Sequence, residues 1–166
     1  TRNAKPSGAA SARSMTSPPG LDYTRRCPRC ADVHRMSLPP DLKILVVDDF
    51  ESMRRILKQM LNGLGLRNIT LADDGLSALP LLKNGDYGLL ITDWNMPQME
   101  GIELVRAVRA DPRLKQLPIL MVTAEAQRER IIQAAQAGVN EYIVKPFVAA
   151  TLRAKLERLL RNRAAG

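Results

Sequence analysis

The chain has 166 residues, 45% of them hydrophobic and 25% charged, which suffices for one domain with a buried core plus a terminal tail. It contains no run long enough to span a membrane and no secretory signal pattern, so we expect a cytoplasmic protein without membrane contact. The formal net charge is +8, but residues 1–40 contribute +5 (seven Lys/Arg, two Asp/Glu) and the remainder +3 (eighteen against fifteen), which argues against a basic folded surface for nucleic acid.

Residues 1–40 are rich in Ser, Ala, Pro, Gly and Arg and show no hydrophobic periodicity, which predicts a disordered basic leader. This segment contains the motif Cys27-Pro28-Arg29-Cys30, followed by His34. Zinc would need a fourth ligand, and the chain has no other Cys or His. The sequence from Met36 resembles a natural start, so one alternative is that the preceding residues are not native.

From Asp41 onward, five short apolar runs alternate with five amphipathic segments, and we predict one domain over residues 41–163. The predicted strands are 44–47, 69–71, 89–92, 118–122 and 141–144. The predicted helices contain the apolar positions within 53–64, 76–82, 104–108, 131–135 and 152–160. Pro80 should lie in the first turns of its helix or cause a kink.

Nearly continuous apolar strands that alternate with helices predict an α/β fold, with a parallel sheet covered on both faces. For five such units, the common doubly wound strand order is 2-1-3-4-5. In that order the ligand crevice lies between the first and third strands, at their carboxyl ends.

Polar side chains follow four of the predicted strands at the point where each strand ends. Asp48 and Asp49 follow the first strand, Asp93 follows the third, Thr123 the fourth and Lys145 the fifth. Because carboxyl ends of parallel strands meet at one edge of a sheet, these groups should lie close together. Any one of these Asp or Thr residues could instead be a helix cap or turn former, but their joint placement favours a site.

Three converging carboxylates repel one another unless a cation is present, and ligation by oxygen alone suits Mg²⁺. With Mg²⁺ and Lys145, the formal charges sum to zero. Phosphoryl transfer needs mainly positioning and charge neutralisation, which these groups could provide. Asp93 would then be the nucleophile, Asp48 and Asp49 would hold the metal, and the Thr123 hydroxyl could donate to a phosphoryl oxygen.

Four motifs of the chain resemble the receiver domain of bacterial two-component response regulators, and further segments resemble its CheY-type single-domain chemotaxis regulators. The receiver-like motifs are Val46-Val47-Asp48-Asp49, Asp93-Trp94-Asn95-Met96-Pro97, Val122-Thr123-Ala124-Glu125-Ala126 and Val144-Lys145-Pro146-Phe147. The segments typical of the chemotaxis regulators are 49–55, 134–138 and 147–152. The resemblance covers residues 41 to about 162 and implies the flavodoxin-like receiver fold.

The resemblance implies that Asp93 is the phosphorylation site and that a CheA-type histidine kinase supplies the phosphoryl group. It further implies that Asp48, Asp49, Asp93 and the Asn95 backbone carbonyl bind Mg²⁺. Thr123 and Lys145 would bind phosphoryl oxygens, and the Lys145–Pro146 peptide bond would be cis. Such a protein catalyses only its own phosphorylation and dephosphorylation, the rate of which Asn95 and Glu125 would tune.

The same resemblance implies a partner face in which Tyr142 is the switch aromatic. The face comprises Ala126, Val139, Tyr142, Val144 and Lys155. In the family it docks the flagellar motor switch, the kinase and, in some bacteria, a phosphatase, and we expect a monomer. The alternative is a phosphorelay intermediate or phosphate sink that passes phosphate to a histidine phosphotransfer protein. DNA binding is disfavoured because only one helix follows Lys145.

Overall fold

The computed structural model describes residues 38–124 and 126–164. The chain divides into two units, Thr1–Arg35 and Met36–Gly166, and the description that follows concerns the second. The predicted leader, with Cys27 and Cys30, lies outside the described residues, so those predictions stay open. Among the residues described, no helix combines the length and apolarity needed to cross a membrane.

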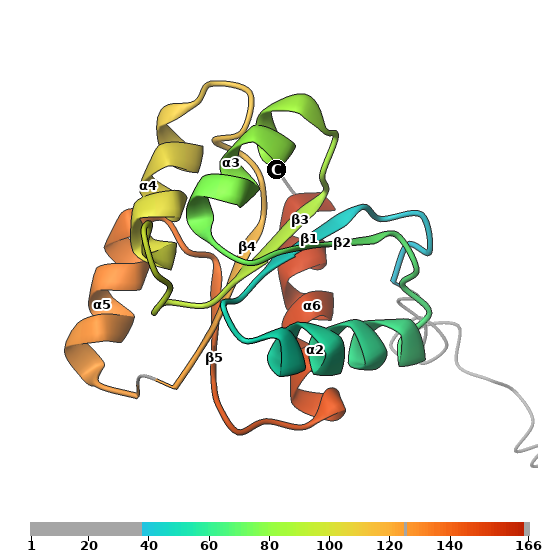
Figure 1. Cartoon of the computed structure of the whole chain (residues 1–166). Coiled ribbons are helices and arrows are strands. Elements are labelled where there is room, and N and C mark those ends of the chain that lie inside the picture. Colours follow the sequence, from blue (N-terminus) through green and yellow to red (C-terminus); the bar gives the residue numbers. More distant parts are fainter. Residues whose placement is uncertain (1–37, 125, 165–166) are drawn as a thin grey trace, which may run out of the picture. The chain divides into compact units, whose positions relative to one another are not determined.

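The centre of the domain is a five-stranded parallel sheet in the order β2-β1-β3-β4-β5, which confirms the predicted topology (Figure 1). The strands are β1 (Ile44–Val47), β2 (Ile69–Ala72), β3 (Leu89–Thr92), β4 (Ile119–Thr123) and β5 (Glu141–Val144). The register pairs Val47 of β1 with Thr92 of β3, so the residues that follow these two strands emerge side by side.

Within residues 38–124 and 126–164, five helices cover the two faces of the sheet (Figure 1). They are α2 (Glu51–Gly63), α3 (Gly75–Asn84), α4 (Gly101–Ala110), α5 (Arg128–Ala137) and α6 (Ala149–Ala164). Buried side chains of α3, α4 and α5 join one hydrophobic cluster, and those of α2 and α6 join another. The sheet separates the two clusters, as expected of a doubly wound fold.

The alternation of side chains along β1 explains why its four residues are all apolar. Leu45 and Val47 belong to the α3–α4–α5 cluster, and Ile44 and Val46 belong to the α2–α6 cluster. All four are at most 1% exposed. Because neither face of this central strand meets water, burial stabilises apolar side chains at every position.

Two helices show how far their sequence patterns predict the structure. Pro80 is the sixth residue of α3 and so lies in its second turn, in agreement with the predicted placement in the first turns, and the helix continues to Asn84. In α5, Ile131 and Ile132 are 40% and 47% exposed, and the buried residue of this helix is Ala134. The apolar pair therefore indicated that a helix forms, but not which side of it faces the core.

Candidate functional site

Three carboxylates meet at the carboxyl edge of β1 and β3. Oxygen atoms of Asp48, Asp49 and Asp93 all lie within 4.8 Å of one another. Asp48 and Asp93 are buried, and Asp49 is half-buried. The structure therefore brings together the three acidic residues that the sequence placed in one crevice.

Lys145, immediately after β5, reaches into this cluster and contacts two of its members. Its Nζ atom lies 2.8 Å from Oδ2 of Asp48 and 3.2 Å from Oδ2 of Asp93. The Lys145–Pro146 peptide bond is cis, as the resemblance implied. Three carboxylates and one ammonium leave a formal charge of −2 in a confined space, which favours binding of a divalent cation.

The two oxygens of Asp93 have different surroundings. Oδ1 accepts a hydrogen bond of 2.7 Å from the backbone N–H of Trp94, whereas Oδ2 faces Lys145. The loop after Asp93 is hydrogen-bonded to the first residue of α4, because the Gly101 N–H donates to the Trp94 carbonyl at 2.9 Å. These contacts orient the Asp93 carboxylate before any ligand arrives.

Burial raises the pKa of Asp93 above 3.8, its ordinary value. Desolvation is the largest cause, and the nearby Asp48 carboxylate adds to it. Lys145 and the Trp94 N–H oppose the shift. The metal-free site therefore disfavours the anionic form that a nucleophile needs, and a bound cation would reverse this preference.

A pH dependence of stability follows for the metal-free protein. Because the pKa of Asp93 is higher in the folded state than in the unfolded chain, folded protein binds more protons between the two values. Stability attributable to Asp93 should therefore fall as pH rises from about 4 through the folded-state pKa, and stay lower above it. Asp93→Asn should remove this loss. In thermal unfolding with EDTA, the stability of the variant relative to wild type should therefore increase as pH rises. A difference between the two proteins that does not change with pH would contradict the assignment.

The residues fit a magnesium ion in one further respect. Oδ1 of Asp49 is buried and has no hydrogen-bond partner in the described part of the chain. A buried carboxylate oxygen without a donor is unfavourable unless a cation occupies the space it faces. Arg54 of α2 donates to the backbone carbonyls of Asp48 (2.6 Å) and Asp49 (3.1 Å), so it holds the loop that carries both carboxylates through the backbone and not through the carboxylate oxygens.

Trp94 should report on metal binding, because it is the sole tryptophan of the chain and its backbone N–H donates a hydrogen bond to Oδ1 of Asp93. Its ring is fully buried, with the Arg130 guanidinium 4.9 Å from the ring centroid. We expect a saturable change in its fluorescence when Mg²⁺ is added to metal-free protein. The change should weaken strongly in Asp49→Asn, and a flat wild-type titration would argue against a cation beside Asp93.

The remaining predicted phosphoryl and metal groups occupy the same edge of the sheet. Thr123 is the last residue of β4, and its side chain is buried. Its carbonyl accepts from the Lys145 N–H at 2.8 Å, which joins the ends of β4 and β5. Asn95 follows Trp94 in the loop after β3 and is exposed. Glu125 lies outside the described residues.

The predicted partner face lies around β5, between α5 and α6. Tyr142 is half-buried and packs against the α3–α4–α5 cluster, while Val144 ends the same strand. Ala126 precedes α5 and is exposed, and Val139 follows that helix. Lys155 of α6 is paired with Glu141 at 2.9 Å, so this predicted partner residue is not a simple solvated lysine.

Sequence reasoning assigned no role to Arg54, Arg130 or Glu141. The role of Arg54 could have been predicted from the sequence. A basic residue in the first turn of the helix that follows an acidic pair can donate to the backbone of the loop carrying that pair. The sequence offered no comparable signal for Arg130 or Glu141, whose contacts join segments that only the tertiary fold brings together.

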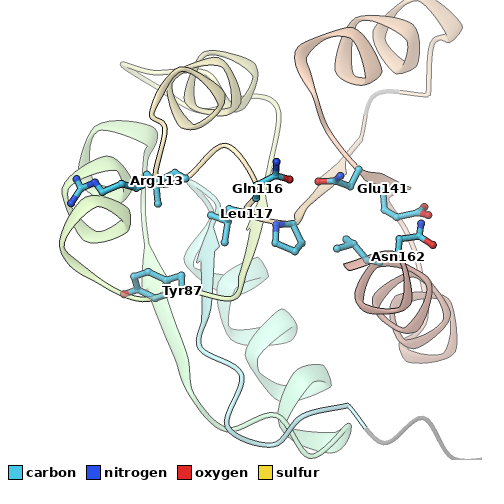
Figure 2. A pocket seen from close by; sticks show the side chains of 10 residues that line it. Tyr87, Arg113, Gln116, Leu117, Glu141 and Asn162 are labelled. Carbon is cyan, nitrogen blue, oxygen red and sulfur yellow. The ribbon is translucent and has the colours of Figure 1, made fainter. Parts of the chain in front are cut away.

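A cavity of about 550 Å³, whose lining side chains are shown in Figure 2, lies near the start of β4 and β5. Pro118 and Asn140, which precede β4 and β5, help to line it. Arg109 of α4 braces this end by donating to the Gly138 carbonyl and to Oδ1 of Asn140. The cavity is therefore separate from the acidic site, which lies at the carboxyl edge.

Comparison with known proteins adds the family to this geometry. The family model described as the response regulator receiver domain matches residues 44–157. The chain belongs to the response regulator receiver family. The match runs from β1 into α6 and so includes all three carboxylates, Thr123 and Lys145 of this receiver.

The receiver is also similar to curated chemotaxis regulators along nearly their whole length. It is 62% identical over 122 residues to chemotaxis protein CheY-3 of Vibrio cholerae, covering 74% of this chain and 94% of that one. It is 62% identical over 118 residues to chemotaxis protein CheY of Pseudomonas aeruginosa, covering 71% of this chain and 95% of that one. These relatives make it a homologue of the chemotaxis response regulators.

Solved structures agree with this fold. The structure of Vibrio cholerae CheY4 matches with a TM-score of 0.67 and 36% identity, covering 71% of this chain and 98% of that one. The receiver domain of a sensor histidine kinase from Pseudomonas aeruginosa matches with a TM-score of 0.67 and 32% identity, covering 72% and 98%. That second structure holds a magnesium ion coordinated in its active site cleft.

Proposed function

We propose that the protein is a single-domain chemotaxis response regulator that accepts a phosphoryl group on Asp93 in a magnesium-dependent reaction. The observation that supports this most directly is the cluster of Asp48, Asp49 and Asp93 with Lys145 bridging two of them. The similarity to chemotaxis regulators supports the biological setting. A CheA-type histidine kinase would be the donor, and the cytoplasm the compartment.

In the proposed reaction, an oxygen of Asp93 attacks the phosphorus atom of a phosphohistidine. The bond between phosphorus and the imidazole nitrogen breaks, its electron pair leaves with the imidazole, and an acyl phosphate forms on Asp93. A bound Mg²⁺, held by the three carboxylates and the Asn95 carbonyl, would neutralise charge on the phosphoryl oxygens. Lys145 and the Thr123 hydroxyl would bind the other phosphoryl oxygens.

The output would pass through Thr123 and β5 to the face that contains Tyr142. The backbone N–H of Lys145 donates to the Thr123 carbonyl at the ends of β5 and β4. A shift of either residue would therefore move the end of β5 as well. When phosphorylated, a monomer of this protein would bind the flagellar motor switch and change its rotation. A phosphatase could bind the same regulator, which would itself catalyse only its own phosphorylation and dephosphorylation.

The proposal is tested by measuring the affinity for an N-terminal peptide of a flagellar motor switch protein. Binding is measured with Mg²⁺, before and after addition of beryllofluoride as an acyl-phosphate mimic. We expect affinity to rise about tenfold or more, which is roughly 1.4 kcal/mol of coupling. Absence of binding in both states would overturn the motor role. It would favour the alternative, a phosphorelay intermediate or phosphate sink, which phosphotransfer from Asp93 to a histidine phosphotransfer protein would reveal.

A further inference from the structure

Glu141, the first residue of β5, is a buried carboxylate that the phosphorylation chemistry does not use. Its side chain is 6% exposed and lies at the α6 end of the cavity shown in Figure 2. Glu141 and Ile143 are both buried, whereas Tyr142 and Val144 between and after them are half-buried. A charge in this position is tolerated only if cations satisfy it.

Two side chains of α6 provide those cations. Nζ of Lys155 lies 2.9 Å from Oε2 of Glu141, and Nε of Arg158 lies 2.7 Å from Oε1. Lys155 and Arg158 are three residues apart and therefore share one face of the helix. Each oxygen of the buried carboxylate has its own cation, so the three groups form a defined triad.

Both cations still reach solvent. The exposed fraction of the side chain is 31% for Lys155 and 69% for Arg158. An ammonium has three donors and a guanidinium five, and the contact of Arg158 with Glu141 is through Nε. The terminal nitrogens of Arg158 can therefore take a second carboxylate while Nε stays anchored.

We infer that Glu141 is a positioning residue that fixes Lys155 and Arg158 as a two-point docking site for carboxylates of an acidic partner peptide. The inference rests on the proposed function in one respect, namely that partners dock on the face formed by α5, β5 and α6. Long cationic side chains lose rotamer freedom when a partner immobilises them. The ion pairs with Glu141 restrict the rotamers of Lys155 and Arg158 before a partner arrives. Binding of the partner therefore costs less side-chain conformational entropy.

A simple charge argument predicts the opposite effect of Glu141. If only net charge mattered, removal of this carboxylate would make the α6 face more positive and strengthen binding of acidic peptides. If positioning dominates, removal frees Lys155 and Arg158 to move and weakens binding. The sign of the change in affinity therefore separates the two explanations.

The test uses the full chain without a phosphodonor, a synthetic hexaglutamate peptide and its hexaglutamine counterpart. Binding is followed at low salt by NMR shifts of the α6 amides. We expect Glu141→Gln to weaken hexaglutamate binding at least threefold, and hexaglutamine to show no α6 shifts with either protein. Equal or tighter binding of hexaglutamate by the variant would overturn the inference, as would the absence of α6 shifts in wild type.

Two further variants complete the design. Asp86→Asn makes the same charge change in an exposed loop before β3 and should not weaken binding. Arg158→Lys keeps the charge but lacks the guanidinium that bridges Glu141 and a partner, so it should weaken binding at least twofold. If Glu141→Gln fails to fold, Arg158→Lys decides, and unchanged affinity would refute positioning. Failure of the motor-switch peptide to bind with beryllofluoride would count against the proposed function alone, since hexaglutamate requires neither.

Discussion

Asp93→Asn should reduce labelling by acetyl phosphate to background, a loss of about 1,000-fold or more, because the variant lacks the attacking carboxylate oxygen. The fold should survive, since the amide oxygen can still accept from the Trp94 N–H. The substitution replaces a desolvated carboxylate by a neutral amide, so the metal-free variant should be more stable than metal-free wild type at neutral pH. The measurement is the mass of the intact protein after incubation with acetyl phosphate and Mg²⁺.

A matched control for this variant is Asp73→Asn. Asp73 is an exposed aspartate near the start of α3, and its hydrogen bond with the Ser77 hydroxyl is the main reason that its pKa is lowered. The control should be labelled at the wild-type rate. If Asp93→Asn were labelled as fast as this control, the nucleophile would have to be another residue.

Gly101→Ala should destabilise the protein by about 3 kcal/mol or more, although alanine normally favours a helix over glycine. A Cβ atom at Gly101 would lie 1.8 Å from the Asp93 backbone carbonyl oxygen, which no side-chain rotation can relieve. The loop after β3 would have to move, and with it the Asp93 carboxylate. Chemical denaturation should show the loss of stability, and magnesium affinity should fall with it.

Gly63→Ala is the corresponding control in α2. Gly63 is the last residue of that helix, and a Cβ there would meet no atom within 4 Å. This variant should be stabilised by about 0.5–1 kcal/mol through reduced entropy of the unfolded chain. If both variants were equally stable, the close approach of α4 to the Asp93 carbonyl would have no energetic consequence.

The sheet and its order could be predicted because a strand buried on both faces is apolar at successive positions. In β1, residues 44–47 are apolar at successive positions, and each packs into one of the two clusters. The polar residues that follow such a strand then stand out. Asp48, Asp49 and Asp93 were predictable for that reason, and the short distances among them follow from the strand register.

Other features depend on contacts between distant segments and leave no local pattern. The apolar pattern predicted a strand over 141–144 but carried no sign that Glu141 is buried and paired with Lys155 and Arg158, which lie in α6 at least fourteen residues later. Ile131 and Ile132 read as core residues, yet they are largely exposed, because α5 packs through Ala134. Helical periodicity indicates that a helix forms but does not decide which side meets the sheet.

The central claim is that Asp93 is the residue that receives the phosphoryl group. The most direct measurement is peptide mapping by mass spectrometry after incubation with acetyl phosphate and Mg²⁺, with borohydride used to trap the acyl phosphate by reduction. We predict a modified residue at Asp93, formed only when Mg²⁺ is present. Modification at Asp48 or Asp49 instead, or equal labelling of Asp93 in EDTA, would contradict the account.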